Sequence, residues 1–99
     1  MPTFEWKLEG QTALFSGELS RLTINKSFET DLRQSFANKD IVIDLVNLHK
    51  VDTAGLALLL IFIENAKKTN NEISLHNIPD DLLKLAKLSA VDFFLPTKI

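Results

Sequence analysis

The sequence IVIDLVNLHKVDTAGLALLLIFIENAKK, residues 41–68, indicates the fold class because its pattern changes from that of a strand to that of a helix. Residues 41–45 are rich in β-branched side chains and apolar on both faces, which is typical of a central strand buried in a parallel sheet. From Thr53 to about Thr69 the pattern is that of a helix. A strand that leads into a helix predicts a right-handed crossover to a further, parallel strand.

The chain before this stretch begins with an expected antiparallel hairpin. Apolar and charged side chains alternate over residues 4–9, and Gly10-Gln11 indicates a turn. A second strand is expected over about residues 12–16, and residues 17–20 should break it.

An amphipathic helix is expected next. Its apolar residues recur every four positions from Ile24 to Phe36, so that they form one stripe along the helix. Ser20 or Thr23 would cap its start, and it should end near Asn38.

The chain after residue 68 predicts one more strand and one more helix. Ile73 to His76 is the strand, and Pro79 suits the first position of a helix that runs to about Ser89. The apolar segment Val91 to Leu95 should pack back on the core. The order β-β-α-β-α-β-α predicts a single α/β (α+β) domain over residues 1–99. Its mixed four-stranded sheet begins with the antiparallel hairpin, and three main helices pack on it.

Composition excludes several classes of function. The chain has 99 residues, a net charge of -2 and no cysteine, which argues against a nucleic-acid binder, a disulfide framework and a zinc site with cysteine ligands. His49 and His76 lie on different segments, so no metal is expected. Because no catalytic or phosphate-loop motif is present, neither an enzyme nor a cofactor is expected.

The location expected from the sequence is the cytoplasm. The N-terminus has no pattern of a signal peptide, and the longest apolar run covers residues 54–63. That run is far shorter than the roughly 20 residues that span a bilayer, so no direct membrane insertion is expected.

The helix that begins at Thr53 is more apolar than one buried face requires. Leu56, Leu59, Ile63 and Ala66 form the expected core face. Opposite them lies a second set of residues, apolar in the middle and charged at the rim, which is typical of a protein interface. We call this set the docking strip, and it comprises Thr53, Ala57, Leu60, Ile61, Glu64 and Lys68. The alternative is a helix covered on all sides by its neighbours.

The start of this helix allows two interpretations. Its free N–H groups would favour a phosphate on Thr53, although the charge of Asp52 would oppose one. Spacing alone favours the other interpretation, in which Asp52 or Thr53 simply caps the helix. Gly55 either permits a close approach of another backbone or is tolerated in the first turn. A ligand site that uses Asp52 with Asp44 is a weaker alternative, since Asp44 is expected to bond backbone in a loop.

Residues 51–60 resemble the STAS domain family, whose pattern is a buried strand ending in Asp-Leu and then Asp-Ser/Thr-x-Gly-Leu at a helix start. Here these are Asp44-Leu45 and residues 52–56. Residues 16–19 also resemble the family's Gly-Glu-Leu-Asp segment, with Ser20 in place of the aspartate. The resemblance covers nearly the whole chain in the order of its elements.

Within that family, residues 52–60, 66–68 and 85–88 are similar to the small cytoplasmic subunit of an ABC phospholipid transporter of Gram-negative bacteria. The resemblance implies binding to the transporter's ATPase subunit, together with a permease and a substrate-binding subunit, in transport that maintains outer-membrane lipid asymmetry. Thr53 falls at the family's phosphoacceptor position, so the alternative is an anti-sigma-factor antagonist switched by its phosphorylation. The implied partner contacts are Asp52, Thr53, Ala54, Ala57, Leu60, Ile61, Glu64, Lys68 and Glu18.

Overall fold

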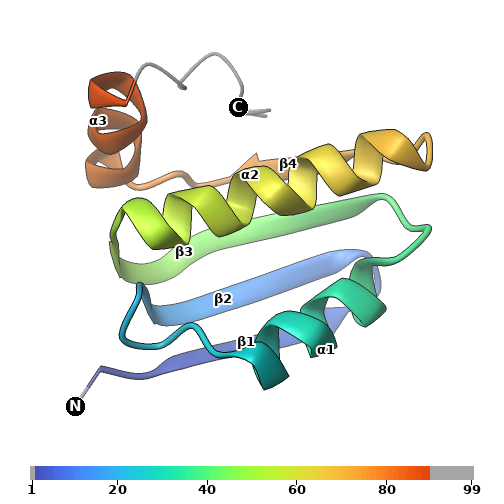
Figure 1. Ribbon diagram of the computed structural model, residues 1–99, viewed down its shortest axis with the longest axis horizontal. Helices are drawn as coiled ribbons and strands as arrows, with labels where there is room; N and C mark the ends of the chain where they lie inside the picture. The colour runs from blue at the N-terminus through green and yellow to red at the C-terminus, as the bar shows by residue number, and fades with distance from the viewer. Residues whose placement is uncertain (1, 90–99) are drawn as a thin grey trace.

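The computed structural model describes residues 2–89, and its elements follow the expected order β-β-α-β-α-β-α (Figure 1). The strands are β1 (Phe4–Glu9), β2 (Thr12–Leu19), β3 (Ile41–Val51) and β4 (Ile73–His76). The helices are α1 (Lys26–Phe36), α2 (Thr53–Lys68) and α3 (Asp80–Leu88). The segment Val91 to Leu95, which was expected to pack on the core, lies outside the described residues.

The four strands form one mixed sheet in the order β1-β2-β3-β4. β1 pairs antiparallel with β2, from Phe4 opposite Gly17 to Glu9 opposite Thr12, which confirms the hairpin. β2, β3 and β4 run parallel to one another, because α1 and α2 cross back between them. The predicted sheet class is therefore confirmed.

Two strands are longer than the sequence pattern predicts. β2 was expected to break at Gly17, but it continues to Leu19 with irregular pairing around Gly17. Gly17 has a φ of 93°, and a Cβ there would lie 2.2 Å from the carbonyl oxygen of Thr3. Glycine thus lets the strand continue where any other residue would clash. β3 likewise runs on from Leu45 to Val51, which pairs with Leu19.

The helix caps also differ from expectation. Asn25, rather than Ser20 or Thr23, caps α1, and its Oδ1 accepts a hydrogen bond of 2.9 Å from the N–H of Phe28. α1 ends at Phe36, two residues earlier than predicted. Pro79 is the N-cap of α3 rather than its first residue.

The core lies between the sheet and α1 and α2, which cover the same face of the sheet (Figure 1). All four residues of the predicted core face of α2 are buried. Leu58 and Phe62 are buried as well, and the ring of Phe62 meets that of Phe36 of α1 at 5.5 Å between centroids. The buried face of α2 is therefore wider than the sequence indicated. None of the helices among residues 2–89 is long and apolar enough to cross a membrane.

Candidate functional site

The start of α2 is tied to the loop between β2 and α1 by one carboxylate. Asp52 is the N-cap of α2, and its Oδ1 accepts a hydrogen bond of 3.0 Å from the N–H of Gly55. Its Oδ2 accepts one of 3.0 Å from the N–H of Arg21, which is 31 residues away in the chain. The predicted cap is confirmed, and it also fixes a distant loop beside the helix.

The same contacts set the protonation of Asp52. Burial alone would raise the pKa of its carboxyl, but backbone N–H groups of Arg21, Gly55 and Ala54 donate to it and the charge of Arg21 adds to their effect. These contacts outweigh burial, and the pKa of Asp52 falls below its ordinary value. The carboxylate is therefore ionised at neutral pH, and it would repel a phosphate on the neighbouring Thr53.

Gly55 brings α2 against the backbone of β2. A Cβ at this position would lie 2.2 Å from the carbonyl oxygen of Leu19 and 2.8 Å from Cγ2 of Val51. Of the two interpretations of this glycine, the close approach of another backbone is the one the structure shows. The helix start is therefore held by packing as well as by its cap.

Glu18 shapes the loop that faces α2. Its carboxylate Oε2 accepts a hydrogen bond of 2.5 Å from Ser20 Oγ, and its carbonyl accepts one of 2.8 Å from Thr23 Oγ1. Ser20 is buried, and its Oγ also accepts from the N–H of Leu22 at 3.2 Å. Ser20, where the STAS pattern has aspartate, therefore takes part in an ordered turn of its own.

The docking strip lies along the outer side of α2. Thr53, Ala57, Ile61, Glu64 and Lys68 are exposed, while Leu60 is half-buried against the core. Exposure of the apolar middle of the strip was predicted and is confirmed. Among the other predicted contacts, Ala54 and Glu18 are half-buried near the helix start.

The predicted contacts do not all meet at one point. Asp52, Thr53, Ala54 and Ala57 gather at the N-terminal end of α2, where Asp52 also contacts the loop that follows Glu18. Lys68 lies 15 residues beyond Thr53, about 22 Å along the helix. The strip therefore runs the length of α2 and fits a broad partner surface better than a small ligand.

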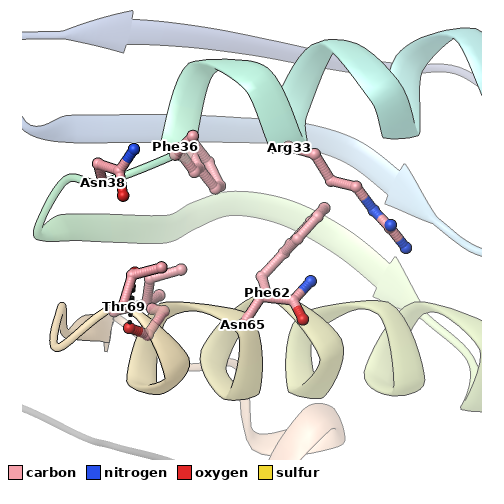
Figure 2. Close-up of a pocket in the computed structure, with 9 residues that line it drawn as sticks. Arg33, Phe36, Asn38, Phe62, Asn65 and Thr69 are labelled. Atoms are coloured by element: carbon pink, nitrogen blue, oxygen red, sulfur yellow. Dashed lines mark hydrogen bonds between the residues drawn. The ribbon is translucent and has the colours of Figure 1, made fainter.

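Two grooves lie beside α2, and they separate this helix from α1 and from the loop that precedes α1. We call the first the N-terminal groove, and it is lined by Arg21, Ile24, Glu29, Ala54, Ala57, Leu58 and Ile61. We call the second the C-terminal groove, and it is lined by Arg33, Phe36, Ala37, Asn38, Phe62, Asn65, Ala66, Thr69 and Ile73. Figure 2 shows Phe36 and Phe62 of the C-terminal groove reaching toward each other from the two helices.

Sequence reasoning missed the contribution of the β2–α1 loop. Arg21 and Ile24 line the N-terminal groove, and Leu22 between them is 67% exposed. The one signal in the sequence was an apolar Leu22 within an otherwise polar turn. Its meaning depended on the contact between Arg21 and Asp52, which no local pattern reveals.

The ligand site that would join Asp44 to Asp52 is wrong. Asp44 lies within β3 rather than in a loop, and its Oδ1 accepts from Asn77 Nδ2 at 2.9 Å and from the N–H of Val46 at 3.0 Å. Asp52 lies eight positions further along the chain, just past the end of this strand, which amounts to about 25 Å. Within residues 2–89 no group of three or more His, Asp or Glu side chains could hold a metal ion.

Comparison with known proteins identifies the family. The profile described as "Mlab, STAS domain" matches residues 6–96 of the chain. The chain belongs to the STAS domain family. It is 37% identical over 86 residues to the protein of Escherichia coli named intermembrane phospholipid transport system binding protein MlaB, and these residues are 87% of each chain. The MlaB protein of Shigella flexneri matches to the same extent.

Solved STAS structures share the fold. The unphosphorylated anti-sigma factor antagonist SpoIIAA superposes with a TM-score of 0.63 at 16% identity, covering 97% of this chain and 88% of its own. A Thermotoga maritima protein described as a candidate anti-sigma factor antagonist gives a TM-score of 0.73 at 12% identity, covering 95% of this chain and 84% of its own. At such low identity these likenesses bear on the fold alone.

Proposed function

We propose that this chain is a non-enzymatic subunit of an intermembrane phospholipid transport system and that it docks on the ATPase subunit of an ABC transporter through α2. The name of the MlaB relatives supports the assignment to such a system. The ATPase would be of the MlaF type, in a complex with an MlaE-like permease and an MlaD-like subunit. The chain would then sit at the cytoplasmic face of the inner membrane through its partner, and it would assemble or regulate the ATPase in transport that maintains outer-membrane lipid asymmetry.

One observation carries the proposal, namely the exposed apolar centre of the docking strip. Ile61 is 41% exposed beside the exposed Ala57, with Thr53, Glu64 and Lys68 at the rim. An apolar centre within a polar rim is the anatomy of a protein interface. The strip runs the length of α2, and the carboxylate at its end, Asp52, already accepts backbone hydrogen bonds through both oxygens. These features suit binding to a protein better than catalysis.

The experiment that tests the proposal is a pull-down of tagged protein from detergent-solubilised membranes, with partners identified by mass spectrometry. We expect an ABC ATPase and its permease in stoichiometric amounts. Thr53→Glu and Leu60→Asp should abolish the complex, because each places a charge on the docking strip. Thr53→Glu should leave the fold intact, since acidic residues are favourable in the first turn of a helix.

Two outcomes would count against the proposal. Unchanged capture by both variants would show that α2 is not the docking surface. Capture of a soluble serine kinase, together with phosphate on Thr53 in the intact mass of protein from cells, would favour the anti-sigma-factor antagonist instead. Leu60 packs partly against the core, so circular dichroism of each variant must show a native spectrum before its binding is interpreted.

A further inference from the structure

The N-terminal groove extends the docking strip onto a second element. It has a volume of about 420 Å³ and opens between α2 and the segment from Arg21 to Glu29. Ala57 and Ile61 belong both to the groove and to the strip, so the two form one continuous surface. The groove's walls are otherwise mostly apolar, from Ile24, Ala54 and Leu58.

An exposed leucine lies in the loop between Arg21 and Ile24, which both line this groove. Leu22 is 67% exposed, although burial of its side chain would be favourable. Its neighbours are fixed, because Arg21 donates its N–H to Asp52 and Ser20 is buried and bonded to Glu18. A large apolar side chain presented on an ordered loop loses little conformational freedom on binding, which favours affinity.

The charged side chains that line the groove differ in whether they already have a partner within the chain. Glu29 on its wall is already bonded to Arg33 at 2.8 Å. The guanidinium of Arg21 makes no hydrogen bond or ion pair with any side chain within residues 2–89, and it acts on Asp52 only through its charge. Both oxygens of Asp52 meanwhile accept backbone N–H groups. Among the described residues that line the groove, Arg21 is therefore the cation available to pair with a carboxylate of a partner.

We infer that the β2–α1 loop is the second half of the partner interface. The N-terminal groove receives one apolar side chain of the ATPase, Leu22 packs against the partner beside it, and Arg21 pairs with a carboxylate on the same segment of the partner. This inference rests on the proposed function and adds to it the loop residues and the chemistry of the segment that they bind.

The test is calorimetric titration of the purified ATPase subunit with the full chain and six variants. Leu22→Ala should raise the Kd about 10-fold, as expected for a buried anchor residue. Its matched control is Val46→Ala, because Val46 is 60% exposed but lies on β3, outside the groove and the docking strip. That control should change the Kd by less than about 2-fold.

The charge is tested by Arg21→Gln, with Lys39→Gln as its matched control. Lys39 is also exposed, but it lies in the connection from α1 to β3, at the opposite end of the molecule (Figure 1). Arg21→Gln should raise the Kd about 5-fold at low salt and flatten its dependence on salt concentration, while Lys39→Gln should do neither. Arg21→Glu should weaken binding further than Arg21→Gln.

The outcomes separate this inference from the proposed function. If Ile61→Asp abolishes binding while Leu22→Ala and Arg21→Gln bind as tightly as their controls, the loop is not part of the interface and the inference is overturned alone. If Arg21→Glu binds like the unaltered chain, the acidic partner segment is overturned. If the unaltered chain does not bind the ATPase, the proposed function fails and this inference fails with it.

Discussion

The two grooves beside α2 are built from the same helices but present very different surfaces. The C-terminal groove is floored by Phe36 and Phe62, which are only 6% and 2% exposed. Its arginine, Arg33, is bonded to Glu29 of its own helix. The N-terminal groove has Ile61 on its wall at 41% exposure, and its arginine has no such partner among the described residues.

An apolar groove is therefore not by itself a docking site. In the C-terminal groove the aromatic rings pack on each other, so their apolar surface already contributes to folding. In the N-terminal groove part of the apolar surface remains in water, and it gains free energy only when a partner covers it. We therefore expect substitutions in the C-terminal groove to lower stability and substitutions in the N-terminal groove to weaken binding.

The largest effect is expected at the floor of the C-terminal groove. Phe36→Ala should lower the free energy of unfolding by about 3–5 kcal/mol, because it removes a buried ring that contacts both Trp6 and Phe62. Urea unfolding followed by circular dichroism measures this loss. Phe36→Leu should cost much less, since it retains most of the apolar volume. A loss below about 1 kcal/mol for Phe36→Ala would show that this groove is not a packing site.

The next largest effect is expected on binding, and it should differ between two positions on α2 that line different grooves. Ile61→Asp should weaken binding to the ATPase at least about 30-fold, as for a central interface residue. Asn65→Asp is the matched control, because Asn65 lies one turn further along α2 on the wall of the C-terminal groove. It should change the Kd by less than about 2-fold, as measured by calorimetric titration. Equal effects of the two substitutions would remove the distinction between the grooves.

A smaller effect is expected where α2 meets β2. Gly55→Ala should lower the free energy of unfolding by about 1–3 kcal/mol, because a methyl group would overlap the carbonyl oxygen of Leu19. The higher helix propensity of alanine offsets only about 1 kcal/mol of this strain. Thermal unfolding of the variant beside the unaltered chain measures the difference. An increase in Tm would show that the backbone of β2 moves away at little cost.

The smallest effect is expected in the pH dependence of stability, through Asp52 at the N-terminal end of α2. The pKa of Asp52 is lowered in the folded chain, so its contribution to stability is complete above the ordinary carboxyl pKa, about 3.9. That contribution is lost as the pH falls through the lowered value. Asp52→Asn, which still caps but does not titrate, should flatten the fall of Tm in this acid range. Identical pH profiles for the two proteins would contradict this assignment.

Local patterns in the sequence predicted most of the fold. The helical spacing in α2 gave both its four expected core residues and its exposed centre, because these follow from the period of one helix. The same spacing did not reveal Leu58 and Phe62 as buried, since their burial depends on where α1 packs. The pattern predicts too short a β2, because glycine ordinarily interrupts a strand, whereas here the positive φ of Gly17 lets the strand continue.

The candidate site was predictable from two sources. Spacing predicts the docking strip of α2 and the cap by Asp52, whereas Ala54 and Glu18 are predicted only by the resemblance to the STAS family. Arg21, Leu22 and Ile24 were missed because they come beside α2 through contacts between residues about 30 positions apart. The placement of these loop residues is a property of the tertiary structure, and no periodicity in the sequence encodes it.

The carboxylate of Asp52 has a consequence for motion as well as for shape. It accepts from the amides of Arg21 and Gly55 together, so neither the loop nor the first turn of α2 can open without breaking a bond to the same group. We expect these two amides to exchange their hydrogens with one common free energy of opening, as a single cooperative unit. Binding of a partner to either segment would then slow hydrogen exchange at both amides.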